Sequence, residues 1–137
     1  MKINVVDENE LVAKTLREFL GDLGHSVRTF SNAKELLASL EKNRSPGEII
    51  ITDLSLHRKD TVSLIREIYN LFPDVRIVAM SASISTLPPD LAVSCGIYAF
   101  LRKPVSLSEL ELMIIRLSER KMKNAQNKVG LGTGRKR

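Results

Sequence analysis

Short apolar runs alternate with amphipathic stretches along most of the chain. Each run has the length of a single strand, and the runs lie at 2–6, 27–30, 49–53, 75–80 and 98–101. After each run, apolar residues recur at steps of three and four, which predicts helices over about 11–23, 33–40, 62–72, 89–95 and 107–117. Strand and helix therefore alternate five times, and this indicates an α/β fold with a parallel sheet and helices on both faces.

The run at 49–53 is the most informative of these segments. Three β-branched apolar residues, Ile49 to Ile51, lead through Thr52 into the single carboxylate of Asp53. A run that is apolar on both faces is typical of a strand buried between two layers of helices. Ligands of open parallel sheets bind beyond the carboxyl ends of the strands, so Asp53 stands where chemistry is expected.

Helix boundaries are marked by capping residues. Asn32 and Ser106 are each followed three residues later by glutamate, as in a capping box. Asp60 or Thr61 is suited to begin the third predicted helix, and the last helix is expected to fray in the 120s. The sequence thus predicts one domain over 1–120 and a flexible, glycine-containing basic tail over 121–137.

Charge and composition narrow the class of protein. The net charge is +5, but the segment from 120 onward has seven basic residues and no acidic one, which leaves 14 basic and 16 acidic residues in 1–119. No apolar run approaches the roughly 20 residues that cross a bilayer, and no signal segment follows Met1, so a cytoplasmic protein is expected. The single cysteine, Cys95, excludes an internal disulfide and a cysteine metal cluster.

Polar residues follow four of the predicted strands. They are Asp7 and Glu8, then Asp53, Ser81 and Lys103. In a parallel sheet these ends lie along one edge, so three carboxylates, a hydroxyl and an ammonium group are brought together. Such carboxylates suit Mg²⁺, and a carboxylate can attack phosphorus to form an acyl phosphate. The expected chemistry is phosphoryl transfer, with Lys103 and Ser81 contacting phosphoryl oxygens.

These motifs resemble the receiver domain of a two-component response regulator, as found in bacterial phosphorelays. The matching stretches are Val5 to Glu8, Asp53, Met80 to Ala82, and Phe100 to Pro104. The resemblance covers residues 1 to about 120. It implies a sheet in the order 2-1-3-4-5 and a signalling domain, not an enzyme with a separate substrate.

The resemblance also implies roles for individual residues. Asp53 would be phosphorylated by a sensor histidine kinase or a phosphotransfer protein, and Lys103 would pair first with its free carboxylate and then with the phosphoryl group. Mg²⁺ would be bound by Glu8, by Asp53 and by the backbone carbonyl of Ser55, with Asp7 acting directly or through water.

The same resemblance implies a conformational switch. Ser81 would move toward the phosphoryl group and Phe100 would turn inward. Signalling would follow through the face formed by the fourth helix, fifth strand and fifth helix, toward a downstream protein or a second copy. Leu112, Met113 and Ile115 widen the apolar stripe of the last helix, which leaves a homodimer or partner surface open beside a broad core face. The basic tail is a solvated end, a tether or a contact to nucleic acid.

The chain departs from the family after Asp53. His57 stands where relatives often have proline, and Thr61 where they have glycine. The alternative function is therefore a receiver-like adaptor that binds a partner without phosphorylation. A flavodoxin-like protein is disfavoured because Asp7 and Glu8 would repel a phosphate after the first strand, and a haloacid-dehalogenase-type phosphatase because position 55 is serine.

Overall fold

The five apolar runs form one parallel sheet. The computed structural model describes residues 1–54 and 59–132, and the strand order is β2-β1-β3-β4-β5, as predicted. The strands are β1 (Lys2–Val6), β2 (Ser26–Phe30), β3 (Ile49–Asp53), β4 (Arg76–Ser81) and β5 (Ile97–Arg102). Each strand begins and ends within one residue of its predicted bounds.

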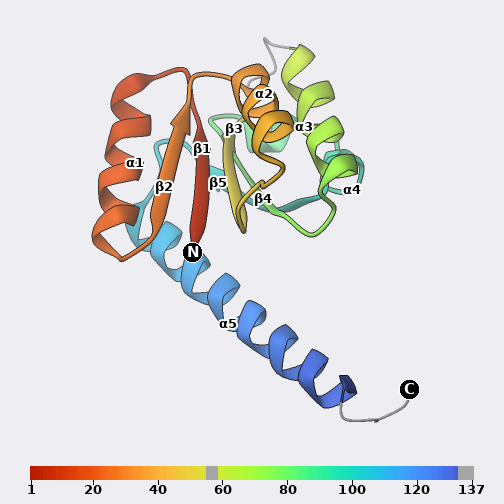
Figure 1. Cartoon of the computed structure of the whole chain (residues 1–137). Coiled ribbons are helices and arrows are strands. Elements are labelled where there is room, and N and C mark those ends of the chain that lie inside the picture. Colours follow the sequence, from red (N-terminus) through yellow and green to blue (C-terminus); the bar gives the residue numbers. More distant parts are fainter. Residues whose placement is uncertain (55–58, 133–137) are drawn as a thin grey trace. The chain divides into compact units, whose positions relative to one another are not determined.

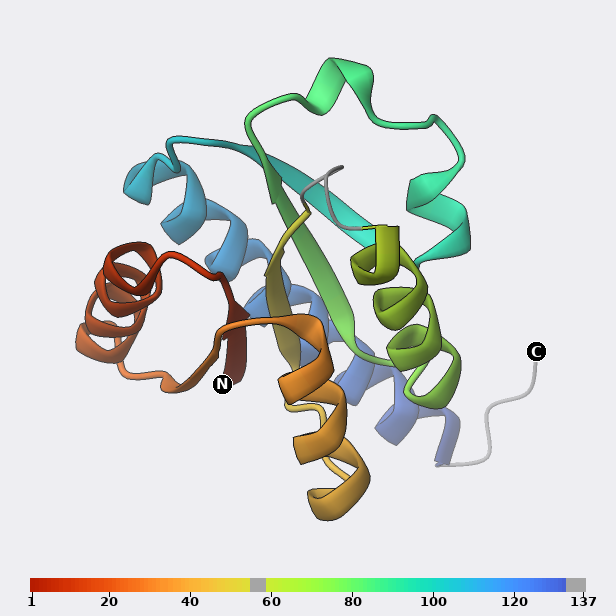
Figure 2. The same cartoon turned by 90° about the horizontal axis from the view of Figure 1, so that it is seen from above.

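The connections between the strands are helical. They are α1 (Glu10–Asp22), α2 (Ala33–Asn43), α3 (Lys59–Leu71), a 3-10 turn η1 (Ile84–Thr86), α4 (Leu91–Ser94) and α5 (Leu107–Gly132). Figure 2 shows α2 and α3 on one face of the sheet and α1 on the other. The third helix begins at Lys59, so Asp60 and Thr61 lie inside it and the prediction that one of them caps it is wrong. The fourth helix is shorter than predicted, because Pro88 and Pro89 delay its start.

The chain divides into two compact units, Met1–Pro104 and Val105–Arg137. The first contains the whole sheet and α1 to α4, and the second contains α5. The helix α5 continues to Gly132, whereas fraying in the 120s was expected. The physical reason is that residues 120–129 contain neither proline nor glycine and include good helix formers such as lysine, alanine and glutamine. None of the described helices is long and apolar enough to span a bilayer.

The core of the first unit is aliphatic. Ile50 on β3 and Ile77 on β4 are fully buried and belong to a cluster that includes Leu36 of α2 and Ile65 of α3. In the second unit, the buried positions of α5 follow the predicted steps of three and four and are Leu110, Ile114 and Leu117. Burial of these side chains, and not helix propensity, supplies most of the stability of such elements.

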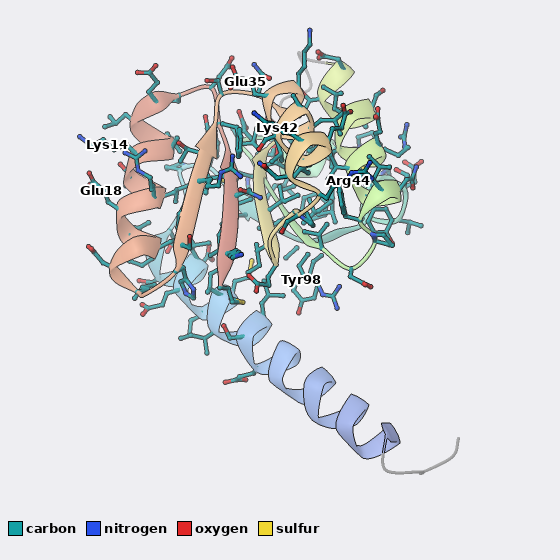
Figure 3. All side chains as sticks on the ribbon, in the orientation of Figure 1. Lys14, Glu18, Glu35, Lys42, Arg44 and Tyr98 are labelled. Carbon is teal, nitrogen blue, oxygen red and sulfur yellow. The ribbon has the colours of Figure 1, made fainter. Side chains whose placement is uncertain are left out.

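Capping contacts fix the helix starts that lie nearest the carboxyl edge of the sheet. The Asn9 side chain accepts hydrogen bonds from the N–H groups of Leu11 and Val12 and so begins α1. At α2, the Asn32 side chain accepts from the Glu35 N–H group at 2.9 Å, as the capping box predicts. The Glu35 carboxylate, labelled in Figure 3, accepts from the Ser31 N–H group at 3.1 Å.

Candidate functional site

Backbone pairing aligns the ends of the strands at one edge. Asp53 is in register with Met80, and Ser81 is in register with Arg102. The ladder continues past the strands, because the Lys103 N–H group donates to the Ser81 carbonyl at 2.9 Å. At the other side, the Asp7 N–H group donates to the Phe30 carbonyl at 3.0 Å. The predicted site residues therefore meet at the carboxyl edge of the sheet although 96 positions separate Asp7 from Lys103.

Lys103 joins two carboxylates from different strands. Its Nζ atom lies 2.8 Å from Oδ2 of Asp7 and 3.2 Å from Oδ1 of Asp53. The Asp7 side chain is 1% exposed, whereas those of Asp53 and Lys103 are 19% and 23% exposed. A buried carboxylate is costly unless it is paired, so Lys103 stabilises the arrangement of Asp7 as well as facing Asp53.

Asn9 completes the environment of Asp7. Its backbone N–H group donates to Oδ1 of Asp7 at 2.9 Å, while Oδ2 is held by Lys103. Both oxygens of Asp7 are thus engaged in the described structure. This contact was not predicted, although an asparagine directly after Asp-Glu and before an apolar-periodic stretch is a recognisable helix start.

The electrostatic balance at the site favours a cation. Burial raises the pKa of Asp53, and the negative charges of Asp7 and Glu8 raise it further, although Lys103 opposes the change. For Lys103, burial lowers the pKa, but the hydrogen bond to Asp7 and the charge of Asp53 outweigh burial, so the pKa is raised. Lys103 is therefore a firmly protonated point charge, and one lysine does not fully neutralise the acidic groups around Asp53.

A small pocket lies in front of the acidic groups. It is lined by Asp7, Glu8 and Asp53, together with Val6, Ser31, Asn32, Ala33 and Thr61. Within 1–54 and 59–132, no three acidic, histidine or cysteine side chains already form a metal site, and Asp7 is engaged with Lys103. The oxygen donors of Glu8 and Asp53 nevertheless fit Mg²⁺, which binds one or two carboxylates and keeps several waters. Glu8 is exposed at the pocket rim.

The two predicted switch residues lie on the β4 and β5 side of the site. Ser81 is 4% exposed, and its hydroxyl oxygen accepts from the Ser83 N–H group at 3.0 Å. Phe100 is partly buried and packs against the core cluster. A switch would therefore have to break the Ser81–Ser83 hydrogen bond and change the packing of Phe100 against the core cluster. The predicted carbonyl ligand, Ser55, and the unusual His57 lie outside the described residues.

The comparison with known families decides the assignment. The family profile described as the response regulator receiver domain matches residues 3–115, which is most of the chain. The chain belongs to this family. As a receiver domain, it is a signalling domain of a two-component system.

Related proteins and structures agree with the assignment. The receiver domain is 33% identical over 114 residues to the DNA-binding transcriptional regulator NtrC of Azospirillum brasilense, covering 83% of this chain and 23% of that protein. Among solved structures, a receiver domain protein of Clostridium thermocellum is 25% identical, with a TM-score of 0.74 and coverage of 88% and 96%. NtrX of Brucella abortus is 28% identical, with a TM-score of 0.77 and coverage of 98% and 30%.

The receiver domain spans about a quarter of the length of the first curated relatives that it matches. In those proteins most of the sequence lies outside the matching segment. The match therefore covers the receiver domain of these relatives and not their remaining length.

Proposed function

We propose that this receiver domain accepts a phosphoryl group on Asp53 from a histidine kinase or a phosphotransfer protein, in a reaction that requires Mg²⁺. The observation that carries the proposal is the position of the Asp53 carboxylate: it borders a pocket shared with Asp7 and Glu8 and lies 3.2 Å from the Lys103 ammonium group. The family assignment supports it.

The chemistry needs a nucleophile and a means of balancing charge. A carboxylate oxygen of Asp53 attacks the phosphorus atom of a phosphohistidine, the phosphorus–nitrogen bond breaks, and its electron pair returns to the imidazole of the donor. Because its pKa is raised, the Asp53 oxygen is more basic than that of an ordinary surface aspartate. The product is an acyl phosphate that is held where Lys103 can pair with one of its oxygens.

The three carboxylates would have different roles in binding Mg²⁺. Glu8 and Asp53 would hold Mg²⁺, together with the Ser55 carbonyl if the family pattern applies. Asp7 would act through water, since Lys103 and the Asn9 N–H group already engage its two oxygens. Bound Mg²⁺ supplies positive charge against the equatorial phosphoryl oxygens. Lys103 keeps its own contact to Asp7 throughout, which fixes the direction of its ammonium group.

A phosphoryl group adds roughly −1.5 to −2 charges and three acceptor oxygens at the end of β3. The Ser81 hydroxyl can donate to one of these oxygens, because in its contact with Ser83 N–H the Ser81 oxygen is the acceptor and its proton is not used. We infer that a movement of Ser81 toward the phosphoryl group alters the packing of Phe100 on β5. The altered packing would change the affinity of the domain for a downstream protein or a second copy. Nucleic acid would be contacted only through the basic tail or a further domain.

The proposal is tested by incubating the full chain with acetyl phosphate, with and without Mg²⁺, and measuring intact mass. The expected result is a gain of one phosphoryl group that requires Mg²⁺ and is absent from Asp53→Asn. The matched control is Asp22→Asn, which changes an exposed aspartate at the end of α1 and should label like the parent. Labelling that persists in Asp53→Asn would overturn the assignment of the phosphoacceptor.

A further inference from the structure

Part of the pocket lining is uncharged. The carboxylates come from the ends of β1 and β3, whereas Ser31 and Asn32 precede α2, and Thr61 lies in the first turn of α3. These three residues are neutral and polar, and they come from segments that Lys103 and Ser81 do not touch in any described contact.

The two residues before α2 are engaged in starting that helix. The Asn32 side-chain oxygen accepts from Glu35 N–H, and the Ser31 N–H group donates to the Glu35 carboxylate. Their position at the pocket is therefore explained by the start of α2. Thr61 is different, because it lies within α3 and not at its cap, and its side chain is partly buried at the pocket.

A hydroxyl oxygen at this place has a clear chemical use. Mg²⁺ bound through one or two carboxylates keeps several waters, and these waters need hydrogen-bond acceptors. Each oxygen of Asp7 already has one contact, with Lys103 or with Asn9 N–H, so Asp7 can serve only part of this hydration shell. The Thr61 hydroxyl supplies a neutral acceptor that adds no further negative charge to a site where the pKa of Asp53 is already raised.

We propose that Thr61 is a positioning residue for the metal: its hydroxyl oxygen accepts a hydrogen bond from a Mg²⁺-bound water in the acidic pocket. The inference rests on the proposed requirement for Mg²⁺ and extends it to a residue that departs from the usual family pattern. Outer residues of this kind change metal affinity by about 10- to 100-fold when they are replaced.

The test measures the Mg²⁺ dissociation constant of the full chain from the rise in thermal midpoint with Mg²⁺ concentration, with no phosphodonor present. Thr61→Val keeps the shape and removes the hydroxyl, and it should weaken Mg²⁺ binding about 10-fold. Thr61→Ser keeps the hydroxyl and should bind Mg²⁺ within about twofold of the parent. Ser63→Ala, at an exposed position on the same helix, is the matched control and should leave the affinity unchanged.

An equal Mg²⁺ affinity in Thr61→Val and the parent would overturn the role of Thr61. Equal losses in Thr61→Val and Thr61→Ser would also overturn it, because the hydroxyl would not be the determinant. Asp53→Ala separates this failure from that of the proposed function. If Asp53→Ala abolishes Mg²⁺ binding while Thr61→Val has no effect, only the inference about Thr61 fails. If Asp53→Ala has no effect, the metal site itself is wrong.

Discussion

Replacing Lys103 by methionine removes the cation that joins two carboxylates and keeps a side chain of similar length. In the parent, the Nζ atom of Lys103 lies 2.8 Å from Asp7 and 3.2 Å from Asp53. In Lys103→Met, Asp7 keeps only the N–H group of Asn9 among the described donors. Its carboxylate would remain buried beside a second carboxylate, and the folded state should lose stability.

The size of the loss follows from the burial of the three groups. Breaking a fully buried ion pair costs about 3–5 kcal/mol. Here only Asp7 is fully buried, and Asp53 and Lys103 are 19% and 23% exposed, so solvent screening reduces the expected cost to roughly 2 kcal/mol. For a chain of this size, that corresponds to a fall of about 6 °C in the thermal midpoint.

The assay is thermal unfolding at two pH values, with and without Mg²⁺. A carboxyl whose folded pKa lies above its unfolded value adds stability at low pH, and that stability is lost as pH rises through the folded pKa. Lys103→Met removes the charge and the hydrogen bond that lower the pKa of Asp53. The thermal midpoint of the variant should therefore lie further below that of the parent at pH 7.5 than near pH 4. Mg²⁺ should restore part of the loss, because it supplies positive charge to the same carboxylates.

Lys14→Met provides the matched control. Lys14 and Glu18 form an exposed pair on α1, 3.9 Å apart, with side chains 61% and 63% exposed (Figure 3). Such a pair contributes only about 0.3–0.5 kcal/mol, and its loss should not depend on Mg²⁺. The reasoning would be refuted if Lys103→Met and Lys14→Met had equal midpoints, or if Mg²⁺ stabilised Lys103→Met no more than the control.

Three further predictions concern single substitutions. Gly96→Ala should destabilise the fold by more than about 3 kcal/mol, because φ is +63° and the new Cβ atom would overlap the Tyr69 ring. Gly21→Ala, where a Cβ atom would have nothing within 4 Å, should be tolerated, and equal urea midpoints for the two variants would contradict this prediction. Asn9→Ala should cost about 1 kcal/mol in urea unfolding by removing the cap of α1, and Asn9→Ser should retain most of that stability. Asp53→Asn should raise the thermal midpoint relative to the parent at pH 7.5, because the folded state disfavours the charged form of Asp53. Near pH 4 the midpoints of variant and parent should come closer together. A midpoint difference that is the same at both pH values would count against the raised pKa.

Much of the site could be predicted because it depends on topology. Once the alternating pattern indicates a parallel sheet, the residues after its strands must lie at one edge, and Asp7, Asp53, Ser81 and Lys103 do so. The pattern is reliable here because the central strands are apolar on both faces. The chemical roles of these residues stay predictions, since they depend on a metal and a phosphodonor.

Other features depend on side-chain packing that no spacing rule encodes. Lys103 pairs with the free carboxylate of Asp53 at 3.2 Å, as predicted, but its shorter contact to Asp7, at 2.8 Å, was not predicted. The Asn9 N–H contact was not predicted either, because a backbone donor has no signature of its own in the sequence. The helix α5 extends through part of the segment predicted as a tail, because the residues of that polar, basic segment favour a helix.

The most direct test of the account is a crystal structure of the full chain with Mg²⁺ and beryllofluoride, a stable mimic of the phosphoryl group. The predicted result is beryllium bonded to a carboxylate oxygen of Asp53, with fluorine atoms contacted by Lys103 Nζ and the Ser81 hydroxyl, and Mg²⁺ bound by Glu8. An Asp53 carboxylate that stays unmodified at saturating beryllofluoride and Mg²⁺, with its contact to Lys103 unchanged, would contradict the role of Asp53 as phosphoacceptor.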